Sequence, residues 1–208
     1  MKTARLTYSY HPQPSSLSKI DKTLDRIDVR GQAVLDCYCG TGTVLASALS
    51  HGARSATGTD LENYTWCLRR ELWRYLDNSQ LVGDPKLSLY WGVDATVAAR
   101  TLDYDVLVTD PPNPITIVGG SPISVPRDTG HTGHQLTQFW KERLDPNNLM
   151  GAGDGAVEDV VDVISHALDE GARVIVNLFA VRGFDYLEAI SNRFSVVQIH
   201  DSWHEVRP

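Results

Sequence analysis

The sequence predicts an α/β domain with a mostly parallel sheet and helices on both of its faces. Short β-rich runs alternate with helical patterns along the chain, which is typical of strands joined by crossover helices. The chain has 208 residues, a length that fits one domain better than two. Because 42% of the residues are hydrophobic, the chain can bury a sizeable core. We therefore expect one domain over residues 1–208.

The first expected elements surround a glycine-containing turn. A polar segment leads into a helix near residues 16–28, and the apolar run QAVLD predicts a strand at Gln32–Asp36. Glycines within 40–42 predict a sharp turn, and a helix from about 43 to 51 follows it.

Further strands alternate with helical patterns up to residue 110. Runs of β-forming residues predict strands at Ser55–Thr59, Leu87–Trp91 and Asp105–Thr109. Between the first two strands we expect a long helix over 62–77, because apolar residues recur there at helical spacing. The residues of this stripe are Tyr64, Leu68, Leu72 and Tyr75.

Residues 111–155 interrupt this alternation. The stretch is rich in proline and glycine, which predicts a long insertion or lid with one short helix around His134–Leu144. Regular structure resumes with an amphipathic helix at about 156–170. The remaining expected elements are a strand at Arg173–Phe179, a helix near 184–192 and a strand at Ser195–His200.

The charge balance is acidic, with 26 Asp and Glu against 19 Lys and Arg and a net charge of −7. This total counts against binding of nucleic acid by charge alone. Residues 1–30 soften that conclusion, since six Lys and Arg against three Asp leave a local balance of +3. No apolar run approaches the roughly 20 residues that span a bilayer, and residues 1–14 lack the apolar core of a signal peptide. We therefore expect a cytoplasmic protein without membrane contact.

The cysteines and histidines do not predict a metal site. Cys37, Cys39 and Cys67 form an odd set that fits neither a redox pair nor the usual zinc spacing, so reduced thiols are expected. His131 and His134 stand three residues apart but have no third ligand nearby in the sequence.

The first motif with chemical meaning is the strand–turn–helix at residues 34–43. An apolar strand delivers Asp36, and Gly40 and Gly42 let the backbone turn sharply so that a ligand can lie against the main chain. The spacing matches neither the dinucleotide fingerprint nor a phosphate-binding P-loop, which argues against a dehydrogenase or a nucleotide hydrolase.

The stretch LDCYCGTGTVLASAL resembles motif I of S-adenosylmethionine-dependent methyltransferases, and is most similar to the form found in enzymes that methylate exocyclic amines of nucleic-acid bases. The resemblance implies a Rossmann-like methyltransferase domain with a seven-stranded sheet, and S-adenosylmethionine as cofactor. It also implies that the turn lines the cofactor through Asp36, Tyr38, Cys39, Gly40, Thr41, Gly42 and Thr43.

Two more acidic positions fall where the family has cofactor-binding residues. Asp60, followed by Leu61, resembles the residue that accepts hydrogen bonds from the ribose hydroxyls, and Glu62 is an alternative for that role. Asp94, followed by Ala95, resembles the residue that binds the adenine amino group. A carboxylate after a strand is also a common helix cap, so this alternative stays open for both.

The second motif, Asp110-Pro111-Pro112-Asn113, is similar to the [DNS]-P-P-[YFW] motif of amino-group methyltransferases. An exocyclic amine is a poor nucleophile because its lone pair is conjugated with the ring. The Asp110 carboxylate and the Pro111 carbonyl would accept hydrogen bonds from the amine and favour a geometry able to attack a methyl group. Two prolines hold that carbonyl rigidly, since their φ is fixed. We therefore predict these four residues as catalytic.

This chain departs from the motif at Asn113, where the family has an aromatic residue that stacks on a flipped base. Such stacking is worth about 1–3 kcal/mol per base. Asn113 can still hydrogen-bond a base edge, and Phe139 or Trp140 could supply a ring from the insertion. Alternatively the target is not a base, or the site has lost its activity.

A weaker similarity lies at Tyr10-His11-Pro12, just before the first expected helix. The segment resembles one that precedes motif I in some DNA amino-methyltransferases and closes over the cofactor, which would place His11 at the cofactor. The alternative is a proline-rich entry to a helix that is capped by Ser15 or Ser16.

Together the motifs predict a methyltransferase that acts on an exocyclic amino group of a nucleic-acid base. Adenine N6 or cytosine N4 in DNA is favoured, with guanine N2 or adenine N6 in RNA as the alternative. Residues 31–110 would form the cofactor-binding half, after an N-terminal segment and helix at 1–30, and residues 156–208 the second half of the sheet. Since only 111–155 remain to read a target, a homodimer or a partner protein would supply recognition. A non-catalytic cofactor-binding scaffold is the alternative from a different class of protein. A third alternative is an enzyme whose substrate is a small molecule or a protein amide.

Overall fold

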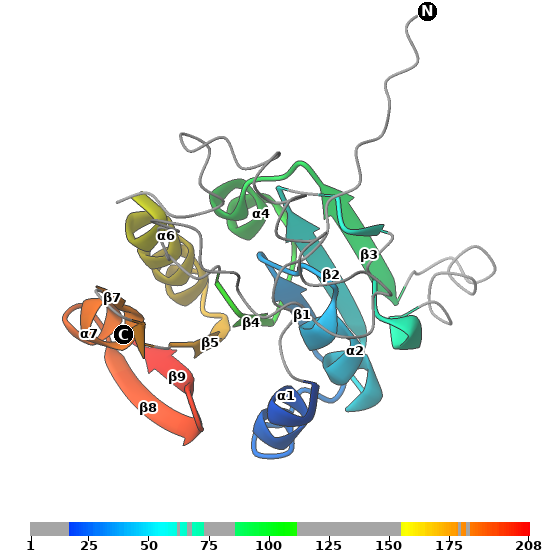
Figure 1. The fold of residues 1–208 in the computed structure, drawn as a ribbon, viewed down its shortest axis with the longest axis horizontal. Helices are drawn as coiled ribbons and strands as arrows, with labels where there is room; N and C mark the ends of the chain where they lie inside the picture. Colours follow the sequence, from blue (N-terminus) through cyan, green and yellow to red (C-terminus); the bar gives the residue numbers. More distant parts are fainter. Residues whose placement is uncertain are drawn as a thin grey trace, which may run out of the picture.

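The computed structural model contains a seven-stranded sheet with the order β3-β2-β1-β4-β5-β9-β8 (Figure 1). The structure describes residues 17–61, 63–65, 68–72, 86–111, 155–178, 180–181 and 184–208. The strands are β1 (Ala33–Asp36), β2 (Ser55–Asp60), β3 (Leu87–Trp91), β4 (Val106–Thr109), β5 (Arg173–Asn177), β8 (Ser195–His200) and β9 (Trp203–Arg207).

The pairing of the strands is mostly parallel. β1 pairs in parallel with β2 and β4, and the parallel arrangement extends to β3 on one side and β5 on the other. β9 is antiparallel to both of its neighbours, β5 and β8. The direction in which the chain adds strands reverses between β1 and β4, which makes this pair the topological switch point of the sheet.

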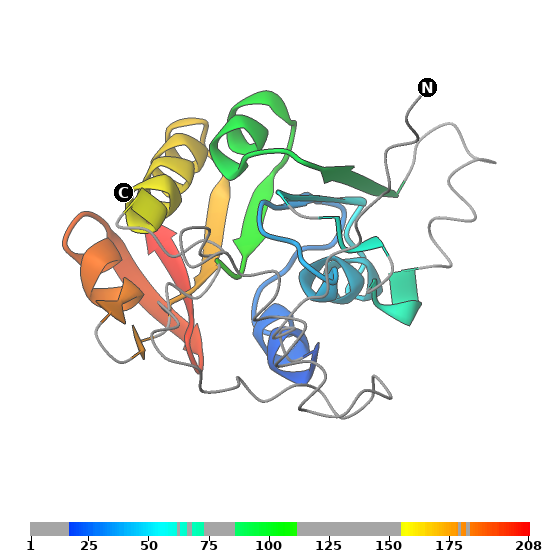
Figure 2. The same cartoon turned by 45° about the horizontal axis from the view of Figure 1, so that its top comes forward.

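Helices cover both faces of the sheet, as expected (Figure 2). Helices α4 and α6 lie together on one face, and α1 and α2 lie on the other. The bounds are α1 (Leu17–Leu24), α2 (Thr43–Ser50), α4 (Ala95–Thr101), α6 (Gly155–Asp169) and α7 (Tyr186–Ser191), with a small second sheet of β6 (Ala180–Val181) and β7 (Phe184–Asp185). The expected fold class is therefore confirmed.

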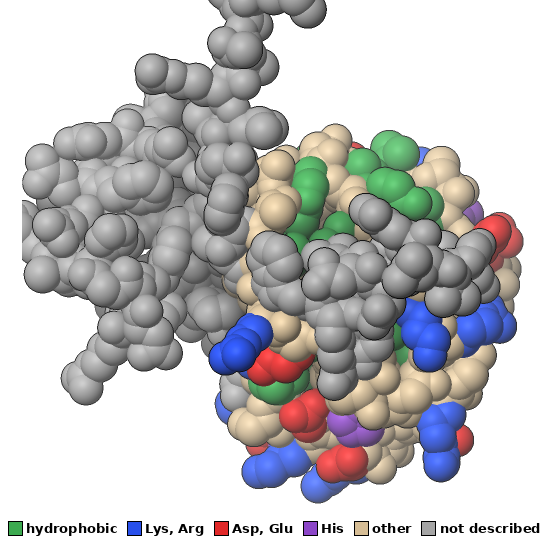
Figure 3. Space-filling model, turned by 90° about the vertical axis from the view of Figure 1, so that its right-hand side faces the viewer, with side chains coloured by type: hydrophobic (Ala, Val, Ile, Leu, Met, Phe, Trp, Pro, Cys, Tyr) green, Lys and Arg blue, Asp and Glu red, His purple; other side chains and the backbone are tan. Residues whose placement is uncertain are grey.

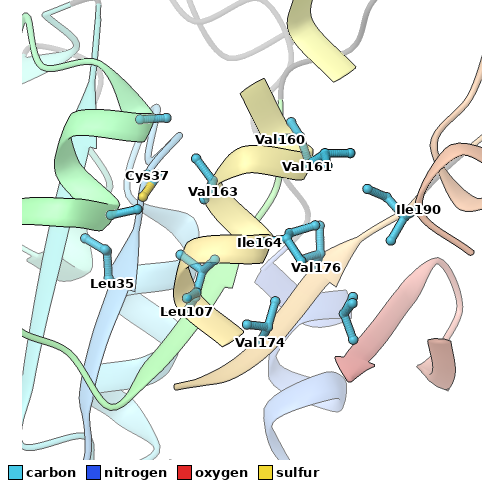
Figure 4. Close-up of a cluster of buried hydrophobic side chains, with 14 of the residues drawn as sticks. Leu35, Cys37, Leu107, Val160, Val161, Val163, Ile164, Val174, Val176 and Ile190 are labelled. Atoms are coloured by element: carbon cyan, nitrogen blue, oxygen red, sulfur yellow. The ribbon is translucent and has the colours of Figure 1, made fainter. Parts of the chain in front are cut away.

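Each face of the central strands has its own core. On the α6 side, Val163 and Ile164 pack with Leu107, Val174 and Val176 of β4 and β5 (Figure 4). The intervening residues of the same strands point to the α1 side, because successive side chains of a strand alternate between faces. This second cluster includes Ile20, Val34, Val108, Ile175 and Trp203. Fully burying one such aliphatic side chain stabilises the fold by about 1.5–3 kcal/mol.

The expected long helix over 62–77 is wrong in its first half. Residues 63–64 and 68–69 are not helical, and a helical turn begins only at Arg70. The Asn63 side chain accepts hydrogen bonds from the backbone N–H and hydroxyl of Thr65, which competes with helix formation. The apolar stripe still packs, since Tyr64 and Leu72 are buried.

The sequence analysis missed four elements, namely α4, β9 and the two-residue strands β6 and β7. α4 is short and alanine-rich, and its sequence has too little amphipathic pattern to predict a helix. β9 reads as polar, WHEVR, yet Trp203, His204 and Val206 are buried between β5 and β8. The expected helix over 16–28 ends at Leu24 and continues only as tight turns. The helix expected around His134–Leu144 lies outside the described residues.

Candidate functional site

The two sequence motifs meet at the switch point of the sheet. Asp36 ends β1 and Asp110 follows β4, and these strands are parallel neighbours with Leu35 opposite Leu107. Parallel neighbours bring their carboxyl ends to the same edge of the sheet. Ligands of open α/β sheets bind outside this edge, at the switch point.

The glycine turn of the first motif is built by left-handed residues. Gly40 has a φ of 47° and Gly42 a φ of 79°, a region that favours glycine. The Gly42 N–H donates to the Cys39 carbonyl at 2.7 Å, and α2 begins at the next residue. A Cβ at position 42 would lie 2.3 Å from Cδ1 of Leu72, so the turn is closed from behind by a buried leucine.

Asp60 stands at the end of β2 and holds the same turn. Its Oδ2 accepts a hydrogen bond from the Gly40 N–H at 3.0 Å, while its backbone carbonyl accepts from Gly92 and Val93. The next side chain, Leu61, is 65% exposed. The Asp60 carboxylate can accept hydrogen bonds from the ribose hydroxyls of an adenosine, and the exposed Leu61 side chain can contact its base. This pair of side chains beside a glycine turn therefore fits an adenosine.

Asp94 caps α4. Its Oδ1 accepts hydrogen bonds from the Thr96 hydroxyl and from the backbone N–H groups of Thr96 and Val97, the last two at 2.8 and 3.4 Å. The hydroxyl bond first, and then the backbone bonds, hold the pKa of the carboxyl below its ordinary value. The side chain is exposed, whereas Ala95 is buried in the core. The structure thus gives Asp94 a capping role, and contact with an adenine stays a prediction.

Asp36 is buried, with 1% of its surface exposed. Its Oδ1 accepts hydrogen bonds from the Thr109 hydroxyl at 2.8 Å and from the Tyr38 N–H at 3.2 Å. Burial, helped by the negative charges of Asp110 and Asp60, raises the pKa of Asp36 to about 8 in spite of the lowering effect of these hydrogen bonds. Asp36 therefore connects the turn after β1 with the end of β4 through buried hydrogen bonds, and its carboxyl is not exposed to a ligand.

This burial makes the stability of the protein depend on pH. The ordinary pKa of Asp36 is 3.8, so between about pH 4 and pH 8 the folded state holds a proton that the unfolded state has lost. The free energy of unfolding should fall as pH rises through this window, by up to about 1.4 kcal/mol per pH unit. Asp36→Asn should flatten this fall in urea unfolding between pH 5 and 8. An equally steep fall in Asp36→Asn, with Asp103→Asn as the exposed control, would contradict the assignment.

The other predicted residues of the turn lie mainly inside the fold. Cys39 packs into a core cluster, and a Cβ at Gly58 would lie 2.9 Å from its Sγ, so its thiol faces the sheet. Thr41 and Thr43 are buried with their hydroxyls 3.3 Å apart, and Tyr38 packs against the α6-side core. Cys39 can therefore contact a ligand only through its backbone groups.

Asp110 is held by a residue that the sequence analysis missed. The Asn177 side-chain amide, at the end of β5, donates to Asp110 Oδ1 at 2.8 Å, and Pro111 is buried beside it. The available signal was a polar residue at the end of the buried run RVIVN. Pro112, Asn113 and His11 lie outside the described residues, so their predicted roles stay predictions.

The surface of the described residues carries charges of both signs. Lys19 stands 3.5 Å from Asp201, and Arg30 pairs with Asp28, so cations of the first helix region stand beside acids. Basic and acidic side chains also lie close together on the face drawn in Figure 3.

Within the described ranges, no helix combines the length and apolar character needed to cross a membrane. In the same part of the chain, no group of three potential ligands could hold a metal ion.

No protein-family model matches the sequence, and no curated protein is significantly similar to it. Solved structures are similar in fold. A TehB-like SAM-dependent methyltransferase from Corynebacterium glutamicum is 17% identical, with a TM-score of 0.47 over 90% of this chain and 85% of the other. Precorrin 8w decarboxylase from Methanobacterium thermoautotrophicum is 16% identical, with a TM-score of 0.48 over 89% and 76%. A ribosomal protein L11 methylase from Lactobacillus delbrueckii subsp. bulgaricus is 18% identical, with a TM-score of 0.43 over 91% and 76%.

Proposed function

We propose that this chain is an S-adenosylmethionine-dependent methyltransferase that acts on an exocyclic amino group of a nucleic-acid base, with adenine N6 or cytosine N4 in DNA favoured. One observation carries the proposal. The glycine turn directly follows β1 and the Asp110-Pro111 segment directly follows β4, and these two strands are parallel neighbours at the switch point of the sheet. A cofactor-binding turn and an amine-binding carboxylate are therefore within reach of one ligand pair.

The cofactor would be held by residues of three strand ends. The turn from Gly40 to Gly42 would take the amino-acid part, Asp60 would accept from the ribose hydroxyls, and Leu61 would contact the adenine. Asp94 is the expected partner of the adenine amino group. When bound, the cofactor supplies a methyl group on a positively charged sulfur atom, and neighbouring carboxylates favour a positive charge.

Asp110 would bind and orient the amine. Its carboxylate would accept an N–H hydrogen bond, stabilise the positive charge that develops on nitrogen as the methyl group is transferred, and accept the proton that the nitrogen then loses. Pro111 would offer its rigid backbone carbonyl as a second acceptor. Because the amine must approach in line with the bond that breaks, positioning by these residues supplies a large part of the rate.

The first experiment is a calorimetric titration of the protein with S-adenosylmethionine, with NAD as the control ligand. We expect saturable binding at one site for S-adenosylmethionine only. Asp60→Ala and Asp60→Asn should both weaken it by at least about tenfold, equivalent to about 1.4 kcal/mol. Asparagine can still accept from Gly40, so its effect separates ribose binding from support of the turn. Asp103→Ala, an exposed change at the opposite edge of the sheet, should leave the affinity unchanged.

The second experiment follows radioactive methyl transfer from S-adenosylmethionine into unmethylated DNA, total RNA and a protein extract. We expect label in DNA, as N6-methyladenine or N4-methylcytosine after digestion. Transfer to DNA should weaken as salt is added, because contacts to phosphate release counterions. Label in RNA alone would move the target to the second polymer. Cofactor binding without transfer to any probe would favour the non-catalytic scaffold.

A further inference from the structure

We infer that Asn177 is a positioning residue for Asp110, and that its side-chain amide fixes the orientation of this carboxylate toward the substrate amine. The inference rests on the proposed function, since it assigns Asp110 the role of binding the amine. The evidence is the place of Asn177 in the sheet, its hydrogen bond, and the state of its second polar atom.

The sheet sets the two side chains next to each other. Val108 of β4 is paired in register with Ile175 of β5, and both belong to the core cluster on the α1 side. Asp110 and Asn177 lie two residues further along the chain, Asp110 directly after β4 and Asn177 at the end of β5, so their side chains point to the same face. The amide Nδ2 donates to Asp110 Oδ1 at 2.8 Å across this pair.

The amide has one atom that the fold leaves unpaired. Asn177 Oδ1 is buried and has no hydrogen-bond partner among the described residues. Leaving a buried acceptor unpaired costs about 1–3 kcal/mol, so the orientation of the amide needs a reason. Reversing the amide would set its carbonyl oxygen against the Asp110 carboxylate oxygen. The carboxylate therefore selects the orientation in which Nδ2 faces it.

A fixed carboxylate matters because misplacing a catalytic group by about 1 Å can lower the rate about 100-fold. The amide engages Oδ1 and so limits rotation of the Asp110 carboxylate. The amide itself is firmly placed, because Asn177 pairs with the buried Trp203 of β9 and the following N–H of Leu178 donates to the Ser202 carbonyl at 2.7 Å. Asn177 and Trp203 of this network lie on strands, which hold a group more rigidly than loops do.

The test uses Asn177→Leu, which keeps the branched shape and the number of side-chain heavy atoms and removes both the donor and the unpaired acceptor. With unmethylated DNA as the probe, we expect kcat to fall about 10- to 100-fold, while the Kd for S-adenosylmethionine and the KM for DNA stay within about twofold. The urea midpoint should change little, because removal of the unpaired buried atom offsets the loss of the hydrogen bond to Asp110. The matched control is Asn192→Leu, an exposed asparagine at the end of α7. Wild-type kcat in Asn177→Leu would overturn the inference, and so would a lowered urea midpoint accompanied by loss of cofactor binding.

A double-mutant cycle separates this inference from the proposed function. If Asn177 acts through Asp110, Asn177→Leu should change the urea midpoint in wild-type protein differently from in Asp110→Ala, because the interaction partner is gone. Additive changes would overturn the inference. This cycle needs no substrate. If no probe is methylated by the wild type, the proposed function fails, while the coupling between the two residues is still decided.

Discussion

Asp110→Ala is expected to lower kcat for methyl transfer by at least about 1,000-fold while leaving the Kd for S-adenosylmethionine within about twofold. The carboxylate follows β4 at the switch point, where it would accept the amine hydrogen bond, whereas the cofactor would lie on the turn after β1 and on Asp60. Radioactive methyl transfer to DNA and calorimetry on the same preparation measure both quantities.

Asp110→Asn is the matched variant for this prediction. It keeps the shape and a carbonyl acceptor but removes the negative charge, so its rate should lie below the wild type and above Asp110→Ala. The exposed Asp103→Ala should behave as the wild type. Turnover retained in Asp110→Ala would remove Asp110 from the mechanism. Loss of cofactor binding in the same variant would show that the change has disturbed the turn.

Gly42→Ala is expected to lower the free energy of unfolding by about 2–5 kcal/mol and to abolish cofactor binding. A non-glycine residue in the left-handed region costs about 1–2 kcal/mol. The new Cβ would also lie 2.3 Å from Cδ1 of the fully buried Leu72, and overpacking costs about 1–3 kcal/mol. Urea unfolding and calorimetry with S-adenosylmethionine measure the two effects.

Gly31→Ala is the control for the backbone contribution. Gly31 has a similar φ of 71°, but a Cβ there would meet nothing within 4 Å. It should therefore show only the conformational cost and leave cofactor binding intact. Equal destabilisation in the two variants would mean that Leu72 moves aside freely. Intact cofactor binding in Gly42→Ala would contradict the placement of the ligand on this turn.

Local sequence pattern determined most of the sheet. The buried runs around Val34 and Val108 are apolar on both faces, which only a central parallel strand requires, and they were predicted within one residue of their observed starts. The left-handed conformation of Gly42 was also foreseeable, because a glycine turn after an apolar strand is a local signal. The long helix failed because Asn63 forms local hydrogen bonds that hydrophobic spacing does not report.

Tertiary structure decided how the motif residues are used. Asp36 reads as a ligand-binding carboxylate, yet it is buried and hydrogen-bonded to Thr109, 73 residues away in the chain. Asp94 caps a helix that the sequence did not announce. The pairing of β5 with β9 buries a polar-looking strand that includes His204.

The sequence by itself determined the glycine turn, the Asp-Pro-Pro segment and the strands that carry them, because each is encoded by residues that are close together in the chain. Only the tertiary structure decided that Asn177 meets Asp110 across 67 residues, and that Asp36 lies beneath both motifs. The physical reason is that burial and long-range hydrogen bonds depend on which strands become neighbours. That choice is made by packing of the whole sheet, and no single segment contains it.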